Sequence, residues 1–476
     1  MDTNRRDFVA AAGATLASSV LARRVKGAND RIAVGFIGVG IMGQVDLALA
    51  MRHPELQVAA VCDVYQPNLE KAVATAQKGG HQPKFFKDFR DLLAEKSIDA
   101  VCIATPDHWH ALMTVEACKA GKDVYVEKPA CTHVDEAPKM VEAARKYNRV
   151  VQGGTQSRSA GHMHAIRELL ASGELGEVTF ARVWDYSLEP PEGLSNPPDG
   201  DPPAGLDWNM WLGPAPMRPF NQNRFETYRG LYSAFHYFWD YSGGQITDRG
   251  VHLIDLLQMA FNETAPRAAA SFGTKKYLKD NREVPDTQVC IYEYPEFLMA
   301  YEHRWANAQS MFGRSSGILV HGSKGTLCFG RPPAYQIYAE QEPVLAPVNL
   351  VGTMPPAAAR VPILGSLGGA DGAEGAQFAI ASLRAVPAEA PKPAVNRSFE
   401  PTQSHWANFL QCVRSRQRPI ADIEYAARSA VTCLLGNVAL RGRIRVEYDP
   451  KTWTSPQKEA RSWMASKYRA PWKLEV

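Results

Sequence analysis

From residue 31 onward, short apolar runs alternate with longer helix-like segments. Residues 31–37 form a β-branched apolar run, which is typical of a buried parallel strand. Similar runs follow at 57–62, 100–104, 123–126 and 150–152. Helix-like patterns lie between them, at 44–51, in an Ala-rich segment that follows His110 and ends at Ala120, and at 138–148. Because strand–helix alternation with short connections produces parallel strands, the pattern predicts an α/β fold with a doubly wound parallel sheet over residues 30–152.

The rest of the chain has a less regular pattern. Strand-like alternation occurs at 178–186, 268–277, 287–294 and 297–305. Helical spacing occurs at 245–261, 404–414 and 423–441, and a further strand is predicted near 444–448. Nine prolines in residues 189–219 predict an ordered but irregular loop. We expect a second domain over residues 153–450 and a C-terminal arm over 451–476.

The N-terminal segment, residues 1–28, resembles a twin-arginine export signal. Arg5 and Arg6 precede fourteen uncharged residues from Val9 to Ala22, although Asn4 stands where such signals usually have Ser or Thr. Fourteen residues are too few to span a bilayer, so no stable membrane insertion is predicted. The sequence predicts a periplasmic protein carried by the twin-arginine export machinery. The alternative is a cytoplasmic protein with a basic tail.

Charge and cysteine content exclude several classes of protein. Of 53 basic and 50 acidic residues in 476, five basic and two acidic ones lie within 1–28, which leaves 48 of each sign in the remainder. Because the chain beyond residue 28 has no net charge, it does not attract the phosphate backbone, and nucleic acid is an unfavourable partner. The eight cysteines show no CxxC and no metal-ligand spacing, so we expect buried thiols and no metal.

The sequence Gly38-Val39-Gly40-Ile41-Met42-Gly43 lies between the first predicted strand and the first helix. In a dinucleotide site Gly38 permits the tight turn, Gly40 lets the backbone approach a pyrophosphate, and Gly43 lets helix and strand pack closely. Asp63 lies twenty residues beyond Gly43, where a carboxylate accepts hydrogen bonds from ribose hydroxyls and repels a 2′-phosphate. The motif predicts NAD rather than NADP, and the alternative is a glycine turn without a ligand. The predicted cofactor contacts here are Gly38, Gly40, Ile41, Met42, Gly43 and Asp63.

Two more strand ends are expected at the same crevice, because parallel sheets bind ligands at the carboxyl ends of their strands. One strand runs into Thr105-Pro106, with His110 close behind, and the next runs into Glu127-Lys128-Pro129. These segments add Thr105, Pro106, His110, Glu127 and Lys128 to the predicted cofactor contacts.

Together these motifs resemble the glucose–fructose oxidoreductase / inositol dehydrogenase / MocA (Gfo/Idh/MocA) family of NAD(P)-dependent oxidoreductases. Segments 206–214, 243–255 and 468–472 are similar to exported bacterial members. The resemblance implies a second α/β domain built on a large open, mostly antiparallel sheet. It also implies that this sheet pairs subunits, as a homodimer or homotetramer.

Lys128, at the mouth of a predicted strand, is expected to approach the nicotinamide end of the crevice. The resemblance implies that it hydrogen-bonds the substrate hydroxyl that is oxidised, where a cation stabilises the developing alkoxide. It also implies a cis peptide bond before Pro129. The alternative is a structural pair with Glu127 or a phosphate.

Asp248 and His252 are four residues apart in a helical pattern, so they share one face. A carboxylate beside an imidazole makes a competent general base near neutral pH. The pair matches the catalytic pair of the inositol dehydrogenase branch, and the alternative is a solvated helix face. Asp255 lies seven residues beyond Asp248 and is a weaker candidate for the same face.

Four further residues are weaker candidates for substrate binding. Gln156 and Arg158 follow a predicted strand and face either the cleft or solvent. Trp208 and Trp211 are three residues apart and either stack on a sugar ring or serve core packing or a subunit contact.

The sequence predicts an enzyme that moves a hydride between NAD and a secondary hydroxyl of a sugar or cyclitol-like substrate. The first alternative is an NAD-dependent glycosidase, in which oxidation is transient and no net redox change occurs. The second is an NAD-binding sensor without catalysis. Because free NAD is scarce outside the cytoplasm, an exported enzyme of this kind is expected to hold its cofactor tightly.

Overall fold

A computed structural model describes residues 31–225, 227–228, 232–330, 335–340 and 401–476. The predicted export signal, residues 1–28, lies outside the described residues. In the described part of the chain, no helix combines the length and the apolar character needed to cross a membrane.

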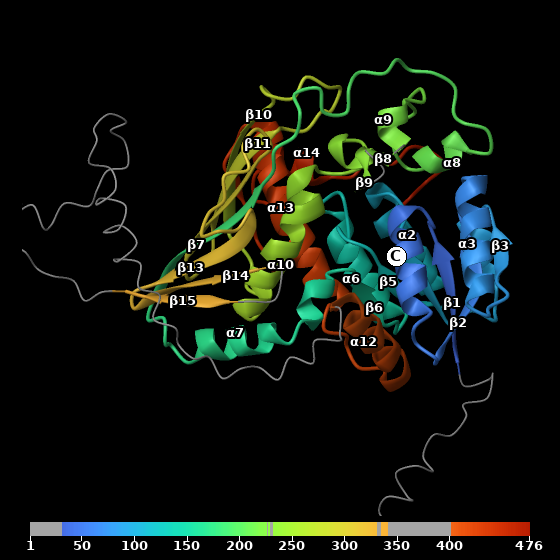
Figure 1. The fold of residues 1–476 in the computed structure, drawn as a ribbon, viewed down its shortest axis with the longest axis horizontal. Coiled ribbons are helices and arrows are strands. Elements are labelled where there is room, and N and C mark those ends of the chain that lie inside the picture. The colour runs from blue at the N-terminus through green and yellow to red at the C-terminus, as the bar shows by residue number, and fades with distance from the viewer. Residues whose placement is uncertain (1–30, 226, 229–231, 331–334, 341–400) are drawn as a thin grey trace, which may run out of the picture.

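The first domain is built on six parallel strands in the order β3-β2-β1-β4-β5-β6 (Figure 1). The strands are β1 (Ile32–Ile37), β2 (Leu56–Cys62), β3 (Lys84–Phe86), β4 (Ala100–Ile103), β5 (Asp123–Val126) and β6 (Val151–Gly153). The connecting helices are α2 (Ile41–Ala50), α3 (Gln66–Lys78), α4 (Phe89–Ala94), α5 (His110–Lys119) and α6 (Glu136–Lys146). The predicted doubly wound sheet is confirmed, and β1 and β4 lie side by side where the strand order reverses.

Strand β3 was not predicted. It is a three-residue edge strand, and the Phe85 side chain in it is 65% exposed. Such a strand has no apolar run, so the pattern that identifies buried strands misses it.

The second domain contains an eight-stranded sheet in the order β15-β14-β13-β7-β12-β11-β10-β16. Only β7 and β12 pair in parallel, which confirms the mostly antiparallel sheet. The strands are β7 (Val178–Tyr186), β10 (Ala268–Thr274), β11 (Thr287–Glu293), β12 (Leu298–Arg304), β13 (Ser316–Gly322), β14 (Gly325–Phe329), β15 (Gln336–Ala339) and β16 (Val446–Glu447). The sequence did not predict β13, β14 and β15.

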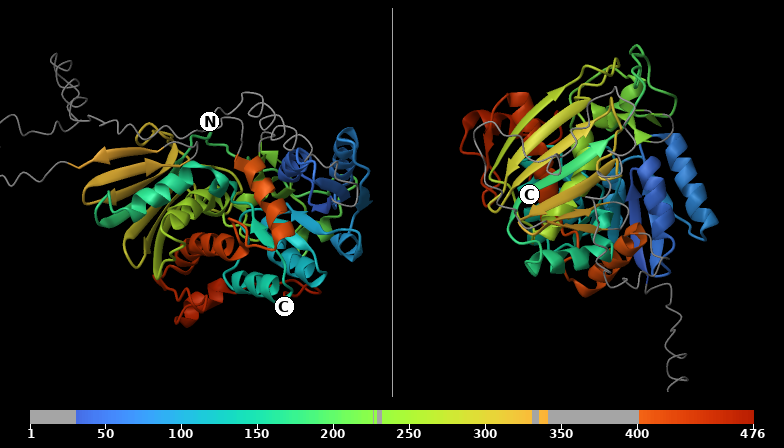
Figure 2. Two further views of the ribbon diagram at one scale, coloured as in Figure 1. Left: turned by 90° about the horizontal axis from the view of Figure 1, so that it is seen from below. Right: turned by 60° about the vertical axis from the view of Figure 1, so that its left-hand side comes forward.

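Helices fill the space between the two sheets (Figures 1 and 2). Helix α13 (Ile423–Gly442) packs on β10 of the large sheet and on α6 of the first domain, and α10 (Val251–Ala260) packs beside α13. The opposite face of the large sheet carries exposed apolar side chains, among them Phe272, Ile291 and Leu298. Helix α7 (His162–Ala171) lies along one end of this sheet (Figure 1).

The C-terminal region ties both domains together. In α12 (Pro401–Ser415), the Trp406 ring stacks on Tyr125 of β5 with centroids 4.6 Å apart. After α14 (Lys458–Met464), Trp472 packs against Trp109 with centroids 4.8 Å apart. Close by, the Arg469 guanidinium donates to the carbonyl oxygen of Gly213 at 3.0 Å. These contacts fix the segment around Gly213 against the first domain.

Short elements connect the main ones and carry several site residues. They are η2 (Asp107–Trp109), η3 (Gln156–Ser159), α8 (Trp208–Leu212), α9 (Gln222–Phe225), β8 (Thr227–Tyr228), β9 (Tyr232–Ser233), η4 (Ala234–Tyr237) and the π-helical turn η5 (Ile246–Gly250). The predicted helix 245–261 is therefore a π turn followed by α10.

Candidate active site

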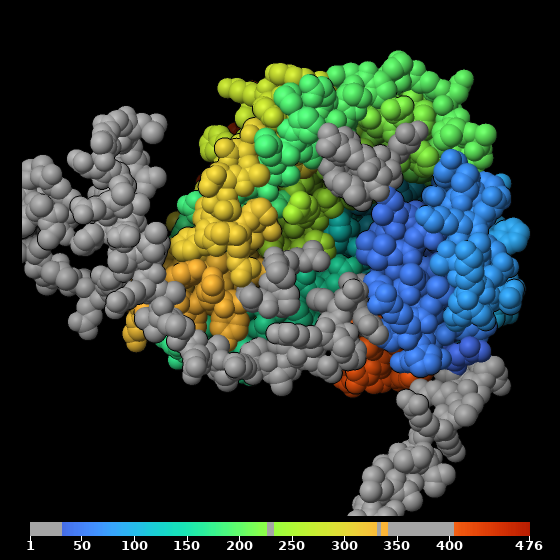
Figure 3. Space-filling model, in the orientation of Figure 1, coloured from blue at the N-terminus to red at the C-terminus, as the bar shows by residue number. Residues whose placement is uncertain are grey.

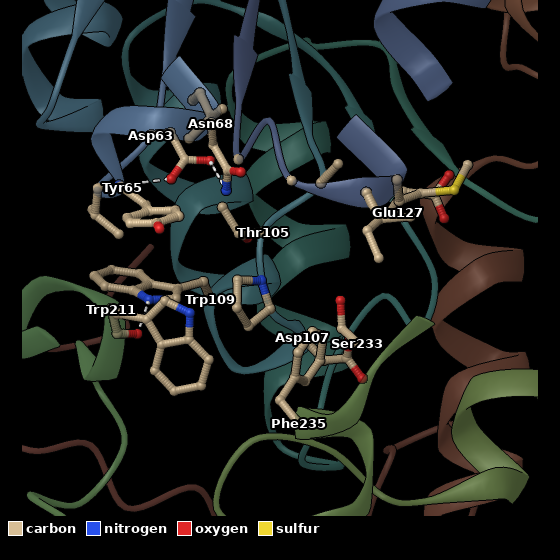
Figure 4. A pocket seen from close by; sticks show the side chains of 18 of the residues that line it. Asp63, Tyr65, Asn68, Thr105, Asp107, Trp109, Glu127, Trp211, Ser233 and Phe235 are labelled. Atoms are coloured by element: carbon tan, nitrogen blue, oxygen red, sulfur yellow. Dashed lines mark hydrogen bonds between the residues drawn. The ribbon is translucent and has the colours of Figure 1, made fainter. Parts of the chain in front are cut away.

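A cavity of about 460 Å³ opens at the carboxyl ends of β1, β2, β4 and β5 (Figure 4). Its floor is the glycine-rich turn and the two further strand ends that the sequence placed at the same crevice. Its roof comes from the second domain, through residues of the long irregular loop and of η4. Figure 3 shows this loop, in green, directly beside the blue surface of the first domain.

Of the three glycines of the turn, only Gly40 leaves room for a ligand, as the sequence predicted. A Cβ on Gly43 would lie 2.0 Å from the carbonyl oxygen of Gly38, so this glycine serves close packing. A Cβ on Gly38, whose φ is +79°, would lie 2.6 Å from the backbone nitrogen of Thr105. A Cβ on Gly40 would meet no protein atom closer than 3.7 Å, so the space in front of Gly40 is open to an approaching group. Gly38, Gly40, Ile41 and Met42 line the cavity.

Asp63 ends β2 and holds a fixed position at the cavity. Its Oδ2 accepts a hydrogen bond from the backbone N–H of Val39 at 2.8 Å, and its Oδ1 accepts one from Tyr65 at 2.8 Å (Figure 4). Burial raises the pKa of Asp63 to about 6, although these hydrogen bonds oppose the shift. The carboxylate is thus preorganised beside the glycine-rich turn.

The long loop closes over this end of the cavity. The backbone N–H of Asp207 donates to the carbonyl oxygen of Val64 at 3.0 Å, so the loop docks beside Asp63. Trp211 of the loop lines the cavity. Trp208 stacks on Trp211 with centroids 4.6 Å apart and an interplanar angle of 16°, but it is absent from the cavity wall. Its indole N–H donates to the backbone carbonyl oxygen of Arg218 at 2.8 Å.

Glu127 and His110 hold the neighbouring strand ends in place. Burial raises the pKa of Glu127 to about 7, and its Oε1 accepts a hydrogen bond from Gln156 at 2.7 Å. The His110 ring lies between two carbonyl oxygens, 2.7 Å from that of Pro129 and 2.9 Å from that of Thr105. Glu127, His110, Thr105 and Pro106 line the cavity, whereas Gln156 lies behind Glu127.

Lys128 and Asp248 form an ion pair that joins the two domains. The Lys128 ammonium donates to Oδ1 of Asp248, and their side chains are 16% and 13% exposed. Burial alone would lower the pKa of Lys128, but the charges of Asp248 and Asp107 outweigh it and raise the pKa. Burial would likewise raise the pKa of Asp248, but Lys128 and His236 hold it well below its usual value. Both groups therefore stay charged.

His236, on η4, lies at the same point of the cavity wall. Its Nε2 is 3.8 Å from Oδ1 of Asp248, and its Nδ1 is 3.4 Å from Oδ2 of Asp107. Asp107 also accepts a hydrogen bond from the Ser242 hydroxyl. Burial opposes ionisation of Asp107, but His236, His110 and Lys128 together outweigh it, so the pKa of Asp107 is lowered. Lys128, His236 and Asp107 all line the cavity.

Neither Asp107 nor His236 was predicted as a site residue. Asp107 lies inside the Thr105–His110 segment, where its place after a strand end was a usable signal. His236 lies in a short 3₁₀ turn whose sequence carries no periodic pattern and no motif. Only the folded chain brings it to Lys128.

His252 lies in the first turn of α10 and is buried. Burial raises the pKa of Asp248, and Lys128 and His236 oppose it most strongly. The charge of His252 adds a smaller effect that also lowers the pKa of Asp248. The residues that line the cavity do not include His252 or Asp248. Asp248 therefore reaches the cavity through its contacts with Lys128 and His236.

Arg158 and Asp255, two predicted substrate contacts, lie in a buried structural network instead. The Arg158 Nε donates to Oδ2 of Asp255 at 2.7 Å, and the rest of the guanidinium pairs with both oxygens of Glu263. Asp255 also accepts a hydrogen bond from Ser429 at 2.8 Å. The side chains of Arg158 and Asp255 are each 1% exposed, and neither lines the cavity. The reason is that η3 turns Arg158 toward α10 and away from the strand ends.

Three family models match the chain. "Oxidoreductase family, NAD-binding Rossmann fold" matches residues 32–155, "Oxidoreductase family, C-terminal alpha/beta domain" matches residues 165–270, and "GFO/IDH/MocA C-terminal domain" matches residues 221–328. The first match covers the domain that carries the glycine-rich turn, and the other two cover β7 to β13.

Two sequence relatives are similar over part of the chain. Inositol 2-dehydrogenase of Rubrobacter xylanophilus is 33% identical over 174 residues, which are 36% of this chain and 49% of that protein. A glycosyl hydrolase family 109 protein of Saccharopolyspora erythraea is 35% identical over 159 residues, which are 32% of this chain and 34% of that protein. The chain thus spans about half or less of the length of these relatives.

The fold is similar to that of a solved dehydrogenase. The WlbA dehydrogenase from Bordetella pertussis, in complex with NADH and UDP-GlcNAcA, superposes with a TM-score of 0.59 at 16% identity. The superposition covers 88% of this chain and 99% of that one. At this identity the similarity shows the shared two-domain architecture.

Proposed function

The chain belongs to the Gfo/Idh/MocA family of oxidoreductases, and on that premise we propose that it moves a hydride between NAD and a secondary hydroxyl of a sugar or cyclitol. One observation carries the proposal. A buried lysine, held charged by a carboxylate, lines the same cavity as the glycine-rich turn and Asp63.

The cavity residues fit a bound dinucleotide. The open space at Gly40, next to the start of α2, suits a pyrophosphate, because free N–H groups and the helix dipole favour an anion there. Asp63 is placed to accept hydrogen bonds from the adenosine ribose. The bound cofactor supplies the group that accepts the hydride.

Lys128 is the residue that would hold the substrate oxygen. Its ammonium donates hydrogen bonds, and its raised pKa keeps it cationic at neutral pH. A cation fixed in a partly buried site stabilises an alkoxide more strongly than water does. Asp248 anchors the ammonium, and two histidines near Asp248, His236 and His252, are available to take the hydroxyl proton.

The substrate class is proposed from the relatives. Trp211 lies at the Asp63 end of the cavity, is 5% exposed and already stacks on Trp208, so it gives no support for a sugar ring beside Lys128. The names of the similar proteins point to a polyol and a nucleotide sugar, so a molecule with several hydroxyl groups is the proposed substrate.

The test is an oxidation assay on a panel of sugars, inositols and glycosides. The purified protein with NAD is incubated anaerobically, and the absorbance of the reduced cofactor is followed together with mass spectrometry of the product. We expect reduced cofactor and a keto-sugar in equal amounts. Absence of reduced cofactor and of any altered sugar across the panel would contradict the proposal.

A second candidate function is NAD-dependent cleavage of a glycoside without net redox change. The observation that favours it is the similarity to a glycosyl hydrolase family 109 protein. The same assay separates the two functions. A cleaved sugar with the cofactor still oxidised would support cleavage, whereas a keto-sugar with reduced cofactor supports net oxidation.

We also propose that the protein is exported with its cofactor bound. Support comes from the paired arginines in residues 1–28 and from the loop that covers the Asp63 end of the cavity. A dissociation constant below about 10 nM, worth roughly 11 kcal/mol, would keep NAD in place during export. Denaturing the purified mature protein should release near-stoichiometric NAD, measured by mass spectrometry. Empty protein that binds added NAD only in the micromolar range would contradict this proposal.

A further inference from the structure

The C-terminal arm and the long irregular loop are far apart in the sequence and lie against each other in the structure. The Arg469 guanidinium donates to the carbonyl oxygen of Gly213 at 3.0 Å. It also donates to the side-chain and backbone oxygens of Asn209, at 2.8 and 3.0 Å. The backbone N–H of Arg469 donates to the carbonyl oxygen of Pro214 at 2.8 Å. One residue of the arm thus fastens several consecutive turns of the loop.

Aromatic packing joins the arm and the loop to the first domain. Trp472 of the arm packs edge-on against Trp109, with centroids 4.8 Å apart. The Trp109 indole N–H donates to the carbonyl oxygen of Trp211 in the loop at 3.0 Å. A Cβ on Gly213, whose φ is +48°, would lie 1.9 Å from the Trp109 ring, so the loop approaches this ring closely. The three segments therefore form one packed unit beside the cavity.

The same loop is paired with the residues that follow Asp63. The backbone N–H of Gln66 donates to the carbonyl oxygen of Gly205 at 3.0 Å, and that of Asp207 donates to the carbonyl oxygen of Val64 at 3.0 Å. Gly205 and Asp207 are exposed, so water competes for these two hydrogen bonds. On this side the loop is held only weakly.

Aromatic rings from both domains surround the Asp63 end of the cavity. Phe225 packs edge-on against Tyr65, with centroids 5.2 Å apart, and against Trp211 at 6.1 Å. All three side chains line the cavity, and Tyr65 and Trp211 lie on the same side as Asp63 (Figure 4). Because an acidic residue at the end of the second strand binds the adenosine ribose, these rings surround the adenosine half of a bound dinucleotide.

Building on the proposed function, we propose that Arg469 holds the loop closed over the adenosine half of NAD, so that the cofactor leaves only when the loop lifts from residues 64–66. Arg469 does not line the cavity, so it is a positioning residue that acts through the loop. Glu127, next to Lys128, lies on the opposite side of the cavity from Asp63 (Figure 4). Substrate can therefore exchange at Lys128 while the loop stays closed.

The test measures how fast the nucleotide leaves. Purified protein loaded with NADH is mixed with a large excess of NAD, and the fall in NADH fluorescence gives the release rate. Arg469→Met removes three hydrogen bonds from the loop and should raise this rate about 30-fold. ADP-ribose, which lacks the nicotinamide, is then loaded and chased with NADH. Its release should accelerate by the same factor, because the loop covers the adenosine half.

Arg461→Met is the matched control. Arg461 belongs to the same arm, and its guanidinium donates to the carbonyl oxygens of Ser455 and Pro456, each at 2.8 Å. The substitution also removes hydrogen bonds to backbone oxygens, but none to the loop. Both release rates should stay within about twofold of wild type.

Asn209→Asp tests the same contact in the opposite direction. A carboxylate in place of the amide oxygen, 2.8 Å from the Arg469 guanidinium, forms an ion pair and should slow NADH release about threefold. In the Arg469→Met background the same change should not slow release. Since a variant that merely loosens the fold does not release its ligand more slowly, Asn209→Asp decides the question if Arg469→Met fails to fold.

Equal release rates in Arg469→Met and Arg461→Met would overturn the proposal, and so would an Asn209→Asp variant that releases NADH as fast as wild type. Faster release of NADH without faster release of ADP-ribose would overturn the assignment to the adenosine half. These results would leave the proposed oxidation intact. A wild-type protein that binds both nucleotides but oxidises no polyol would overturn the proposed function and leave the role of Arg469 standing, whereas one that binds neither nucleotide would overturn both.

Discussion

The two walls of the cavity are built in different ways. The cofactor wall consists largely of backbone from consecutive segments, with the glycine-rich turn, Asp63 and the strand end at Thr105 all in the first domain. The wall proposed to be catalytic, called the catalytic wall below, consists of side chains from separate elements, with Lys128 and Asp107 from the first domain and His236 from the second. Asp248, also from the second domain, pairs with Lys128 from outside this wall. A backbone site follows from local sequence, whereas a side-chain site exists only where distant segments meet.

The largest expected effect comes from removing the charge that links the two walls. Lys128→Met should lower kcat about 1,000-fold, because the alkoxide loses its stabilising cation. NAD affinity should change far less than kcat, because the glycine-rich turn and Asp63 are untouched, although Lys128 is itself one of the predicted cofactor contacts. Steady-state kinetics and a fluorescence titration measure the two effects separately.

Lys122 provides the matched control for Lys128. It is a buried lysine whose ammonium donates to the carbonyl oxygens of Glu95 and Ile98, at 2.7 and 2.9 Å, away from the cavity. Lys122→Met should lower the melting temperature and leave kcat within about twofold of wild type. If both variants lost activity equally, the catalytic wall would not depend on Lys128.

The next prediction concerns a polar group of the second domain that stabilises the fold and does not line the cavity. Arg158→Met leaves Asp255 buried beside an apolar side chain and should cost about 3 kcal/mol of unfolding free energy. NAD affinity should be unchanged, because Arg158 does not line the cavity. Denaturant unfolding measures the loss.

Arg182→Met is the comparison for Arg158→Met. The Arg182–Glu302 pair is partly exposed, at 37% and 22%, and such pairs contribute at most about 1 kcal/mol. Equal destabilisation by the two substitutions would show that burial of the Arg158 network is not what stabilises the second domain.

A smaller effect tests the backbone character of the cofactor wall. Gly40→Ala adds a methyl group that meets no protein atom within 3.7 Å, so the melting temperature of the cofactor-free protein should not change. The methyl group occupies the approach to the pyrophosphate and should raise the NAD dissociation constant about 30-fold, or roughly 2 kcal/mol. Gly161→Ala, at a glycine with no atom near its Cβ position, should change neither quantity. Unchanged NAD binding in Gly40→Ala would place the cofactor elsewhere.

The smallest effect concerns pH. Burial raises the pKa of Asp63 to about 6, so lowering the pH from 7 to 5 converts most of the acceptor carboxylate into the neutral acid. The NAD dissociation constant should therefore rise about tenfold over this interval. In Asp63→Asn the dependence should weaken to the part contributed by Glu127, whose pKa burial raises to about 7, and a wild-type affinity independent of pH would rule out a role for the Asp63 charge.

The same contrast explains what was predictable from the sequence. Five of the six parallel strands, the glycine-rich turn and Asp63 follow from apolar runs and from spacing within about thirty residues, which a βαβ unit encodes locally. The position of Lys128 at a strand end was equally readable. Its contact with Asp248 spans 120 residues and was not predicted, because the resemblance implied only that the two residues belong to one site.

His236 and the Arg158 network were not predictable by the same route, whereas Asp107 follows a strand end and could have been found by it. The η4 turn that presents His236 has no periodic pattern, and its position depends on how the second domain docks on the first. Arg158 follows a strand end just as Lys128 does, yet the next turn points it into the core. Which polar residue after a strand end meets the ligand is decided by tertiary packing.

The most direct test of the account is to follow the transferred hydrogen itself. The panel polyol with the highest activity is synthesised with deuterium on the carbinol carbon, and the cofactor released after one turnover is analysed by mass spectrometry. The account predicts one deuterium on each reduced cofactor and a slower turnover in the deuterated substrate. Reduced cofactor without deuterium, or product formed while the cofactor stays oxidised and deuterium is lost to water, would contradict it.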